Sequence, residues 1–157
     1  MPDAKARRTL EELAEEILEL STMGSAARFR SKAGAATGHL TETEYLALDA
    51  LIKESPLTVG QIQKAVGVLP AQMSRIVRAL ESKEGKALIT CEINPHDRRR
   101  IDVSLTLVGR KAYQAYREAR LGFTVEILRE LSPTDREEFM RLLRLMRVSV
   151  AKRMQRK

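Results

Sequence analysis

Three arginines in succession, Arg98 to Arg100, are the residues of this chain with the clearest chemistry. They follow the turn-forming pair Asn94 and Pro95, and like charges crowded into one loop are costly unless an anionic partner neutralises them. Guanidinium groups of this kind suit the minor groove of a DNA duplex, whose narrow stretches concentrate negative potential. The alternative is a solvated basic loop with no function, which charge runs often are.

Hydrogen-bonding side chains also gather on a predicted helix that precedes this loop. Gln72 and Arg75 can bond in a bidentate way to adenine or guanine edges, and small residues near the helix N-terminus would allow a close approach to the bases. An ordinary amphipathic surface helix would show a similar pattern, so the prediction of DNA binding depends largely on the arginine loop that follows this helix. The positions expected at the DNA on this helix are Pro70, Ala71, Gln72, Ser74, Arg75 and Arg78.

Two short helices must hold these side chains in place. Gly67 falls where the first helix should end, and Pro70 suits the first turn of the second, because its missing N–H would have no partner there. The second helix is expected to bury the residues that recur at steps of three and four, which are Met73, Ile76, Val77 and Leu80. The apolar side of the first helix and its exit is predicted from Leu57, Ile62, Ala65, Val66, Val68 and Leu69.

Two strand-like runs flank the arginine loop. Residues 87–93 form a short run of strand-forming types, and residues 101–105 alternate apolar and polar side chains. The two runs should therefore pair as a hairpin that carries the arginines at its tip. A helix-turn-helix followed by such a hairpin predicts a winged helix that sits on a DNA duplex.

These segments resemble the MarR (multiple antibiotic resistance regulator) family of winged-helix transcription factors. Residues 57–62 are similar to the start of the family's helix-turn-helix, and residues 72–81 to its recognition helix. The most specific match is Asp97-Arg98-Arg99 followed by Val103-Ser104-Leu105-Thr106 and Gly109, which is similar to the family's Asp-Arg-Arg to Leu-Thr-x-x-Gly signature.

The resemblance also implies roles for the wing residues. Asp97 would brace the wing through an arginine, while Arg98 or Arg99 enters the minor groove. One departure is the segment 82–88, which is a few residues longer than the family's brief turn and leaves open the angle between the wing and the recognition helix. The wing positions expected at the DNA are Asp97, Arg98, Arg99 and Arg100.

Further helices are predicted outside the central module. Thr41 with Glu44 resembles a capping box that opens a helix ending before Pro56, and Pro133 suits the first position of a last helix. A first helix steps through Leu10 to Met23 and weakens towards Gly34 and Gly38, and a long helix follows Thr106. The last helix is expected to bury Phe139, Leu142, Leu143, Met146 and Val150.

The two terminal regions offer more apolar helix face than a winged helix of roughly 65 residues could cover, so we expect them to meet a second copy of the chain. The family resemblance implies the same, because in that family the first and last helices interlock. The alternative is a self-contained helical subdomain within one chain. The predicted interface residues are Leu13, Ile17, Leu20, Phe139, Leu142, Leu143 and Met146.

The predicted fold class is mainly α with a small β-hairpin wing, in which a winged helix-turn-helix is flanked by N- and C-terminal dimerisation helices. We expect a single domain over residues 1–157, with a DNA-binding lobe at 41–106 and a helical dimerisation region at 9–35 and 107–153. The function expected is that of a sequence-specific transcription regulator, a repressor, that binds a pseudo-palindromic operator in double-stranded DNA as a homodimer. The alternative is a nonspecific nucleic-acid-binding or DNA-coating protein that uses the same module.

The composition and the missing motifs exclude several other classes of function. Lys and Arg total 28 against 21 acidic residues, and the resulting net charge of +7 suits a polyanionic partner. The sequence has no run of eighteen apolar residues and no signal-peptide pattern at its start, so we expect a cytoplasmic protein with no membrane partner. Phosphate-binding glycine loops and the common hydrolase motifs are absent from it, which argues against an enzyme and against a cofactor.

The resemblance implies a small-molecule effector, because members of the family bind phenolic or other small acids between the dimer helices and the DNA-binding lobe. The conceivable pocket residues, each of which is more often structural or merely exposed, are Arg28, Arg30, His39, Tyr45 and Tyr113. Cys91 lies in the predicted wing strand without a second cysteine to resolve an oxidised form, so a packed thiol is expected rather than a sensor. His39 and His96 are too few and too far apart to predict a metal site.

Overall fold

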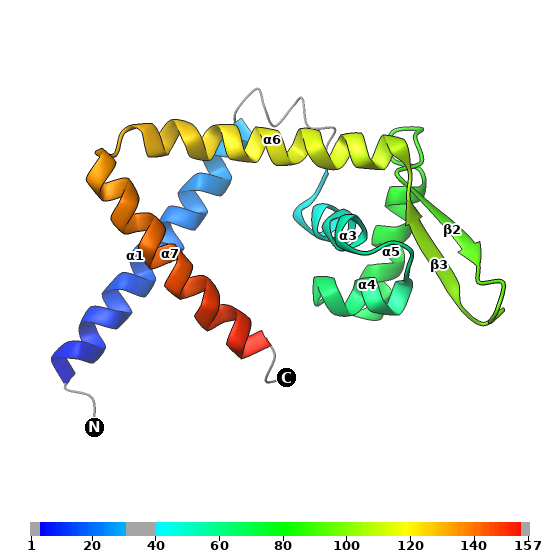
Figure 1. Ribbon diagram of the computed structural model, residues 1–157, viewed down its shortest axis with the longest axis horizontal. Helices are drawn as coiled ribbons and strands as arrows, with labels where there is room; N and C mark the ends of the chain where they lie inside the picture. Colours follow the sequence, from blue (N-terminus) through cyan, green and yellow to red (C-terminus); the bar gives the residue numbers. More distant parts are fainter. Residues whose placement is uncertain (1–3, 31–39, 155–157) are drawn as a thin grey trace. The chain divides into compact units, whose positions relative to one another are not determined.

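The computed structural model describes residues 4–30 and 40–154. Along the chain these form α1 (Ala4–Arg30), α3 (Glu42–Lys53), β1 (Leu57–Thr58), α4 (Val59–Val66), α5 (Pro70–Glu81), β2 (Ile89–Ile93), β3 (Ile101–Leu105), α6 (Leu107–Arg129) and α7 (Pro133–Met154) (Figure 1). The chain divides into two compact units, Met1–Ala119 and Arg120–Lys157. The predicted fold class, mainly helical with a small sheet, is confirmed.

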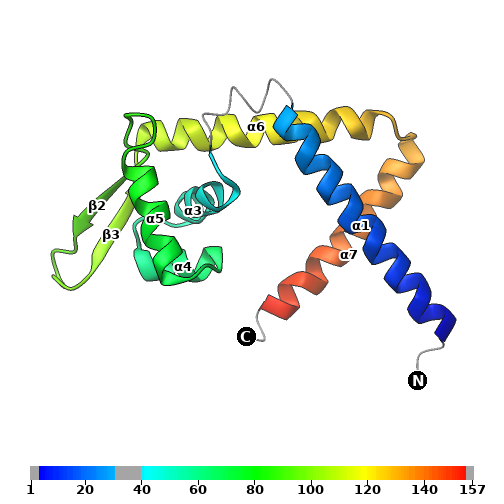
Figure 2. The same cartoon turned by 180° about the vertical axis from the view of Figure 1, so that it is seen from behind.

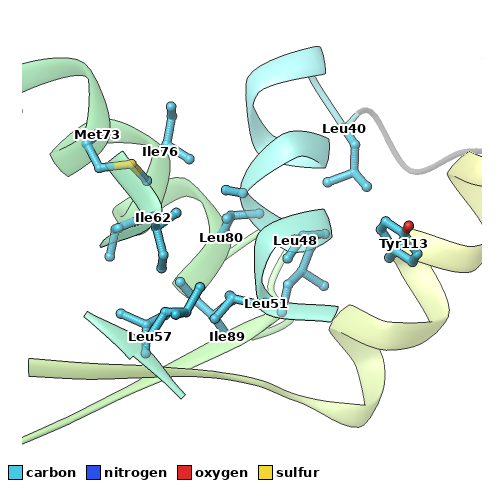
Figure 3. Close-up of a cluster of buried hydrophobic side chains, with 14 residues drawn as sticks. Leu40, Leu48, Leu51, Leu57, Ile62, Met73, Ile76, Leu80, Ile89 and Tyr113 are labelled. Carbon is cyan, nitrogen blue, oxygen red and sulfur yellow. The ribbon is translucent and has the colours of Figure 1, made fainter. Parts of the chain in front are cut away.

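One hydrophobic core organises the part of the first unit that we call the lobe, which comprises α3, β1, α4, α5, β2, β3 and the start of α6. Figures 1 and 2 show these elements gathered at the N-terminal end of α6. Leu48 and Leu51 enter the core from α3, and Met73 and Leu80 enter it from α5 (Figure 3). All four residues predicted for the inner face of the second helix, Met73, Ile76, Val77 and Leu80, are buried.

Local signals define the helix ends in the lobe. Thr41 and Thr58 each form a full capping box, with Glu44 and Gln61 as the respective third helical residues. Gly67 ends α4 with φ of +75°, a left-handed conformation that glycine adopts without strain. Pro70 opens α5 as expected. The predictions for the Thr41 box, Gly67 and Pro70 are therefore confirmed.

The predicted apolar side of the first helix needs correction at three points. Leu57 is buried, but it belongs to β1 rather than to the helix, because Thr58 caps α4 and the helix begins only at Val59. Ala65 and Leu69 are exposed, although both were assigned to the apolar side. The turn at Gly67 redirects the chain, so the periodicity of α4 does not extend to Leu69.

The three strands described pair in the order β1-β3-β2, all antiparallel. The register joins Ile93 to Ile101 at the end of the hairpin and Cys91 to Val103 in its middle. The second strand begins at Ile89 rather than at Ala87 as predicted, because the N–H of Leu88 bonds to the carbonyl of Leu80 on α5 (2.8 Å) instead of to the sheet. The predicted wing hairpin is confirmed, with β2 two residues shorter at its start than predicted.

The terminal helices form as predicted but do not bury their apolar residues within the chain. α7 contains no buried residue, and the expectation that it buries Phe139, Leu142, Leu143, Met146 and Val150 is wrong for a single chain. The seven predicted interface residues on α1 and α7 keep between 39% and 60% of their surface exposed. Apolar side chains of this number left in water indicate surfaces that something else covers.

Candidate nucleic-acid interface

The exposed face of α5 carries the predicted base-reading side chains. All six predicted positions, Pro70, Ala71, Gln72, Ser74, Arg75 and Arg78, are exposed. The Ser74 hydroxyl donates back to the Pro70 carbonyl of its own helix (3.2 Å). Gln72, Arg75 and Arg78 make no side-chain hydrogen bond or ion pair with the described part of the chain, so their donors face solvent. The face is suited to base and phosphate contacts in a major groove.

The wing tip is an ordered loop built around Asn94. The Asn94 N–H donates to the carbonyl of Arg100 (2.9 Å), and its side-chain oxygen accepts the N–H groups of His96 (2.9 Å) and Asp97 (3.0 Å). Its side-chain nitrogen donates to the Asp102 carboxylate near the start of β3 (2.6 Å). One half-buried side chain thus makes three hydrogen bonds, and its backbone N–H makes a fourth, so the loop is shaped without using the arginine side chains.

Asp97 does brace the loop, but through backbone rather than through a guanidinium group. Its carboxylate accepts the backbone N–H of Arg99 (3.1 Å), and its carbonyl accepts that of Arg100 (2.9 Å). Arg98, Arg99 and Arg100 are all exposed, and none of the three guanidinium groups pairs with an acidic side chain in the described residues. Three unneutralised cations on a fixed loop form a surface that attracts a polyanion.

Asn94 and Asp102 are site residues that are not among the positions predicted from the sequence. Asn94 was recognised only as a turn former, although an asparagine side chain that bonds backbone groups two and three residues ahead is a known loop motif. Asp102 gave no local signal, because its bond to Asn94 depends on strand pairing.

The base of the wing is fixed by Thr106 and Gly109. The Thr106 hydroxyl lies within bonding distance of the carbonyl oxygens of Ala87 (2.8 Å) and Leu88 (3.0 Å), and it accepts the N–H of Gly109 (2.9 Å). A Cβ atom on Gly109 would lie 1.9 Å from the Leu88 carbonyl oxygen. Only glycine allows α6 to approach the start of the wing this closely.

The segment 82–88, the departure noted in the sequence, forms a tight turn that is tied to α3. Lys86 N–H bonds to the Lys83 carbonyl (2.8 Å), and the two residues between them, Glu84 and Gly85, have φ of +50° and +76°. Lys83 Nζ lies 2.8 Å from both carboxylate oxygens of Glu44. The two side chains are only 18% and 6% exposed, so this is a largely buried ion pair between α3 and the turn that follows α5.

The aromatic residues predicted for an effector pocket are engaged within the lobe. The Tyr45 and Tyr113 rings stack with centroids 5.2 Å apart, and Tyr45 also stacks on Tyr116 at 4.7 Å. The Tyr113 hydroxyl donates to Asp49 (2.7 Å), and burial together with this bond raises the pKa of Tyr113. The side chains of Arg28 and Arg30, and all of His39, lie outside the described residues.

Cys91 is half-buried in β2, and burial, followed by the nearby Glu81 carboxylate, raises the pKa of its thiol to about 11. The thiol is therefore protonated at neutral pH, which favours the packed thiol over the sensor. The described part of the chain contains no group of three or more side chains that could hold a metal ion. Among the described helices, none is both long and apolar enough to span a bilayer.

Comparisons with known proteins agree with this geometry. Residues 40–101 match the model of the MarR family. The chain is 30% identical over 128 residues to the uncharacterized HTH-type transcriptional regulator YxaD of Bacillus subtilis (strain 168), a match that spans 82% of this chain and 87% of YxaD.

Solved structures of other proteins share the fold. A mutant of S. aureus MepR bound to an oligodeoxyribonucleotide matches with a TM-score of 0.61 at 21% identity, over 88% of this chain and 97% of that chain. A structure of Bordetella bronchiseptica BpsR, which concerns the regulation of its DNA binding by 6-hydroxynicotinic acid, matches with a TM-score of 0.61 at 23% identity, over 84% and 91%.

Proposed function

This chain belongs to the MarR family of winged-helix transcription regulators, and from that premise we propose that it is a homodimeric repressor of a pseudo-palindromic operator. The observation that supports the proposal most directly is that the exposed polar side chains of α5 and the exposed arginines of the wing belong to one packed lobe. α5 contacts β2 directly, so the base-reading face of the helix and the arginine tip of the wing are parts of the same unit. A lobe of this kind can place a helix in a major groove and a wing in the adjacent minor groove.

The proposed DNA contacts are those predicted from the sequence. On α5, Gln72 and Arg75 read base edges, and Arg78 reaches a phosphate. In the wing, Arg98 or Arg99 enters the minor groove. The Asn94 loop supports this assignment, because it holds the backbone while leaving the guanidinium groups free.

The proposed dimer pairs α1 and α7 with their copies in a second chain. The seven interface residues expose apolar surface that the chain's own described part does not cover. A twofold dimer would set two α5 helices in successive major grooves, roughly 34 to 36 Å apart, and would therefore read an inverted repeat. Occupying such a site over a promoter would block transcription.

A small-molecule effector is the last part of the proposal, and its support comes from BpsR, whose DNA binding is described as regulated by 6-hydroxynicotinic acid. A ligand that favours one spacing of the two lobes would shift DNA affinity by about 5- to 150-fold for a coupling of roughly 1 to 3 kcal/mol. Tyr45 and Tyr113 remain candidates for the pocket together with Arg28 and His39. Any ligand there would have to act beside the existing tyrosine stack.

Selection of genomic DNA fragments on the purified protein at near-physiological salt, followed by sequencing, tests the proposal. We expect enrichment of an inverted repeat, with an affinity at least roughly a thousandfold above that for unrelated duplexes. Uniform retention of fragments with a steep salt dependence would contradict the operator model and favour a DNA-coating protein.

Variants of the wing test the contact residues on the selected duplex. Arg99→Ala, and to a lesser degree Arg98→Ala, should weaken binding by roughly 1 to 3 kcal/mol without loss of folding. Arg129→Ala is the matched control, because it removes the same charge from an exposed position on α6. Unchanged affinity in both single variants and in the double variant would remove the wing from the interface.

A further inference from the structure

Leu69 is the most exposed large apolar side chain of the lobe, with 74% of its surface accessible. It is also the N-cap residue of α5, the helix proposed to enter the major groove. The two residues that follow it, Pro70 and Ala71, carry no polar side-chain atom. The leading end of the recognition helix is therefore apolar, and side-chain hydrogen bonding can begin only at Gln72.

The N-cap of α5 contrasts with those of the two helices before it. Thr41 and Thr58 each accept a backbone N–H and complete a capping box, whereas Leu69 makes no side-chain cap hydrogen bond. A leucine at this position costs helix stability relative to serine or threonine, and exposing it costs more. The preference for a hydrogen-bonding N-cap residue is met in α3 and α4 but not in α5. Because the exception lies at a proposed contact surface, it indicates that Leu69 has a function there.

We propose that Leu69 is a specificity-determining residue that packs against the C5-methyl group of a thymine in the major groove. This inference rests on the proposed function, since it requires that α5 lie in that groove. The N-terminal residues of a recognition helix contact the base edges, and Leu69 lies immediately before the first of them. The thymine methyl is the apolar group that a major groove displays on its base edges.

The charges on the same helix support DNA as the occupant of this surface. Arg75 and Arg78 are exposed six and nine residues beyond Leu69, and neither is paired with an acidic group in the described residues. A phosphate contact from Arg78 would fix the register of the helix, and Leu69 would then add to the base discrimination by Gln72 and Arg75. Leu69 thus gives the protein a preference for thymine at one position of each half-site.

Single replacement of thymidine by deoxyuridine tests this assignment, because it removes only the methyl group. The probe is the operator duplex selected above, and affinity is measured by fluorescence anisotropy at near-physiological salt. For the unmodified protein we expect about a fourfold loss at one thymine of each half-site, which corresponds to about 0.8 kcal/mol for one methyl-sized group. Leu69→Ala should bind the thymidine and deoxyuridine duplexes equally.

Two further variants separate this role from a structural one. Leu107→Ala removes a similarly exposed leucine, 70% accessible, from the start of α6. This variant should lose the same affinity on deoxyuridine replacement as the unmodified protein. Leu69→Ser restores a capping hydroxyl, so it should raise the melting temperature by a few degrees while abolishing sensitivity to the methyl group. A lower melting temperature would instead mean that Leu69 packs within the folded protein.

Two results would overturn the inference. In the first, Leu69→Ala loses as much affinity on deoxyuridine replacement as the unmodified protein does. In the second, no single replacement changes the affinity of the unmodified protein. Either result, on a duplex that the protein still prefers to unrelated DNA, leaves the proposed function intact. Failure to find any preferred duplex would remove the proposed function and this inference together.

Discussion

The lobe covers its apolar residues within one chain, whereas α1 and α7 leave theirs in water. Both regions show apolar residues at helical spacing, so their sequence patterns are of the same kind. The difference is that the lobe has a sheet and three short helices that close around one core, while each terminal helix presents its apolar residues to solvent. A periodic apolar face therefore predicts a surface that must be covered, but not the chain that covers it.

The largest effect on assembly and DNA affinity is expected from α7, which buries no residue within the chain. Leu142→Glu would place two charges in the proposed dimer core, at a cost of about 3 kcal/mol or more per interface. We expect the variant to sediment as a monomer and to bind the operator roughly a hundredfold more weakly, because the two lobes would no longer be linked.

Leu107→Glu is the matched control in the lobe, since Leu107 is also an exposed leucine at a helix surface. It should remain dimeric. If the two variants behaved alike by sedimentation, the apolar face of α7 would be ordinary solvated surface and the comparison would fail.

The buried pair of Glu44 and Lys83 should matter far more than an exposed pair outside the lobe. Glu44→Gln leaves the Lys83 ammonium buried without its counter-charge, and we expect unfolding by denaturant to require about 3 kcal/mol less free energy. Glu126→Gln, which breaks the exposed pair with Arg129 on α6, should leave stability unchanged. Equal effects of the two variants would show that Lys83 is solvated in solution.

Gly109→Ala should destabilise the lobe by about 2 kcal/mol, because its Cβ would overlap the Leu88 carbonyl oxygen and force α6 away from the wing. Gly60→Ala is the control, since nothing lies within 4 Å of its Cβ position, and it should be neutral or stabilising by less than about 1 kcal/mol. Thermal unfolding of both variants measures the difference. A neutral Gly109→Ala would mean that the wing base adapts freely.

The smallest effect concerns Asp49 and is a matter of pH. Burial raises the pKa of this carboxyl group, but hydrogen bonds from Lys53 and Tyr113 outweigh burial and lower it below 3.8. A lowered folded-state pKa contributes stability that is present above pH 3.8 and is lost as the pH falls through the folded value. Asp49→Asn should therefore cost about 1 kcal/mol at pH 7 and progressively less below pH 3.8. A cost that is the same at pH 7 and pH 3 would contradict the charged role of Asp49.

Much of the lobe could be predicted because its signals are local. The Thr41 capping box, the glycine that ends α4, the proline that opens α5 and the two wing strands each depend on residues a few positions apart. The exposed face of α5 followed from the apolar spacing of that helix, and the three wing arginines are visible in the sequence as a run. Asn94 was assigned only a turn, although its side chain organises the whole loop, because its partner Asp102 lies on the opposite strand.

The order of the helices and strands, the polar face of the recognition helix and the basic tip of the wing can all be inferred from the residues alone, because short-range sterics and hydrogen bonding decide these features. Three features depend instead on the packing of the folded chain: Leu69 is exposed, Lys83 pairs with Glu44 across 39 residues of chain, and Gly109 lies against Leu88. Contacts between distant segments depend on how complete elements pack, and no local pattern of residues encodes that packing.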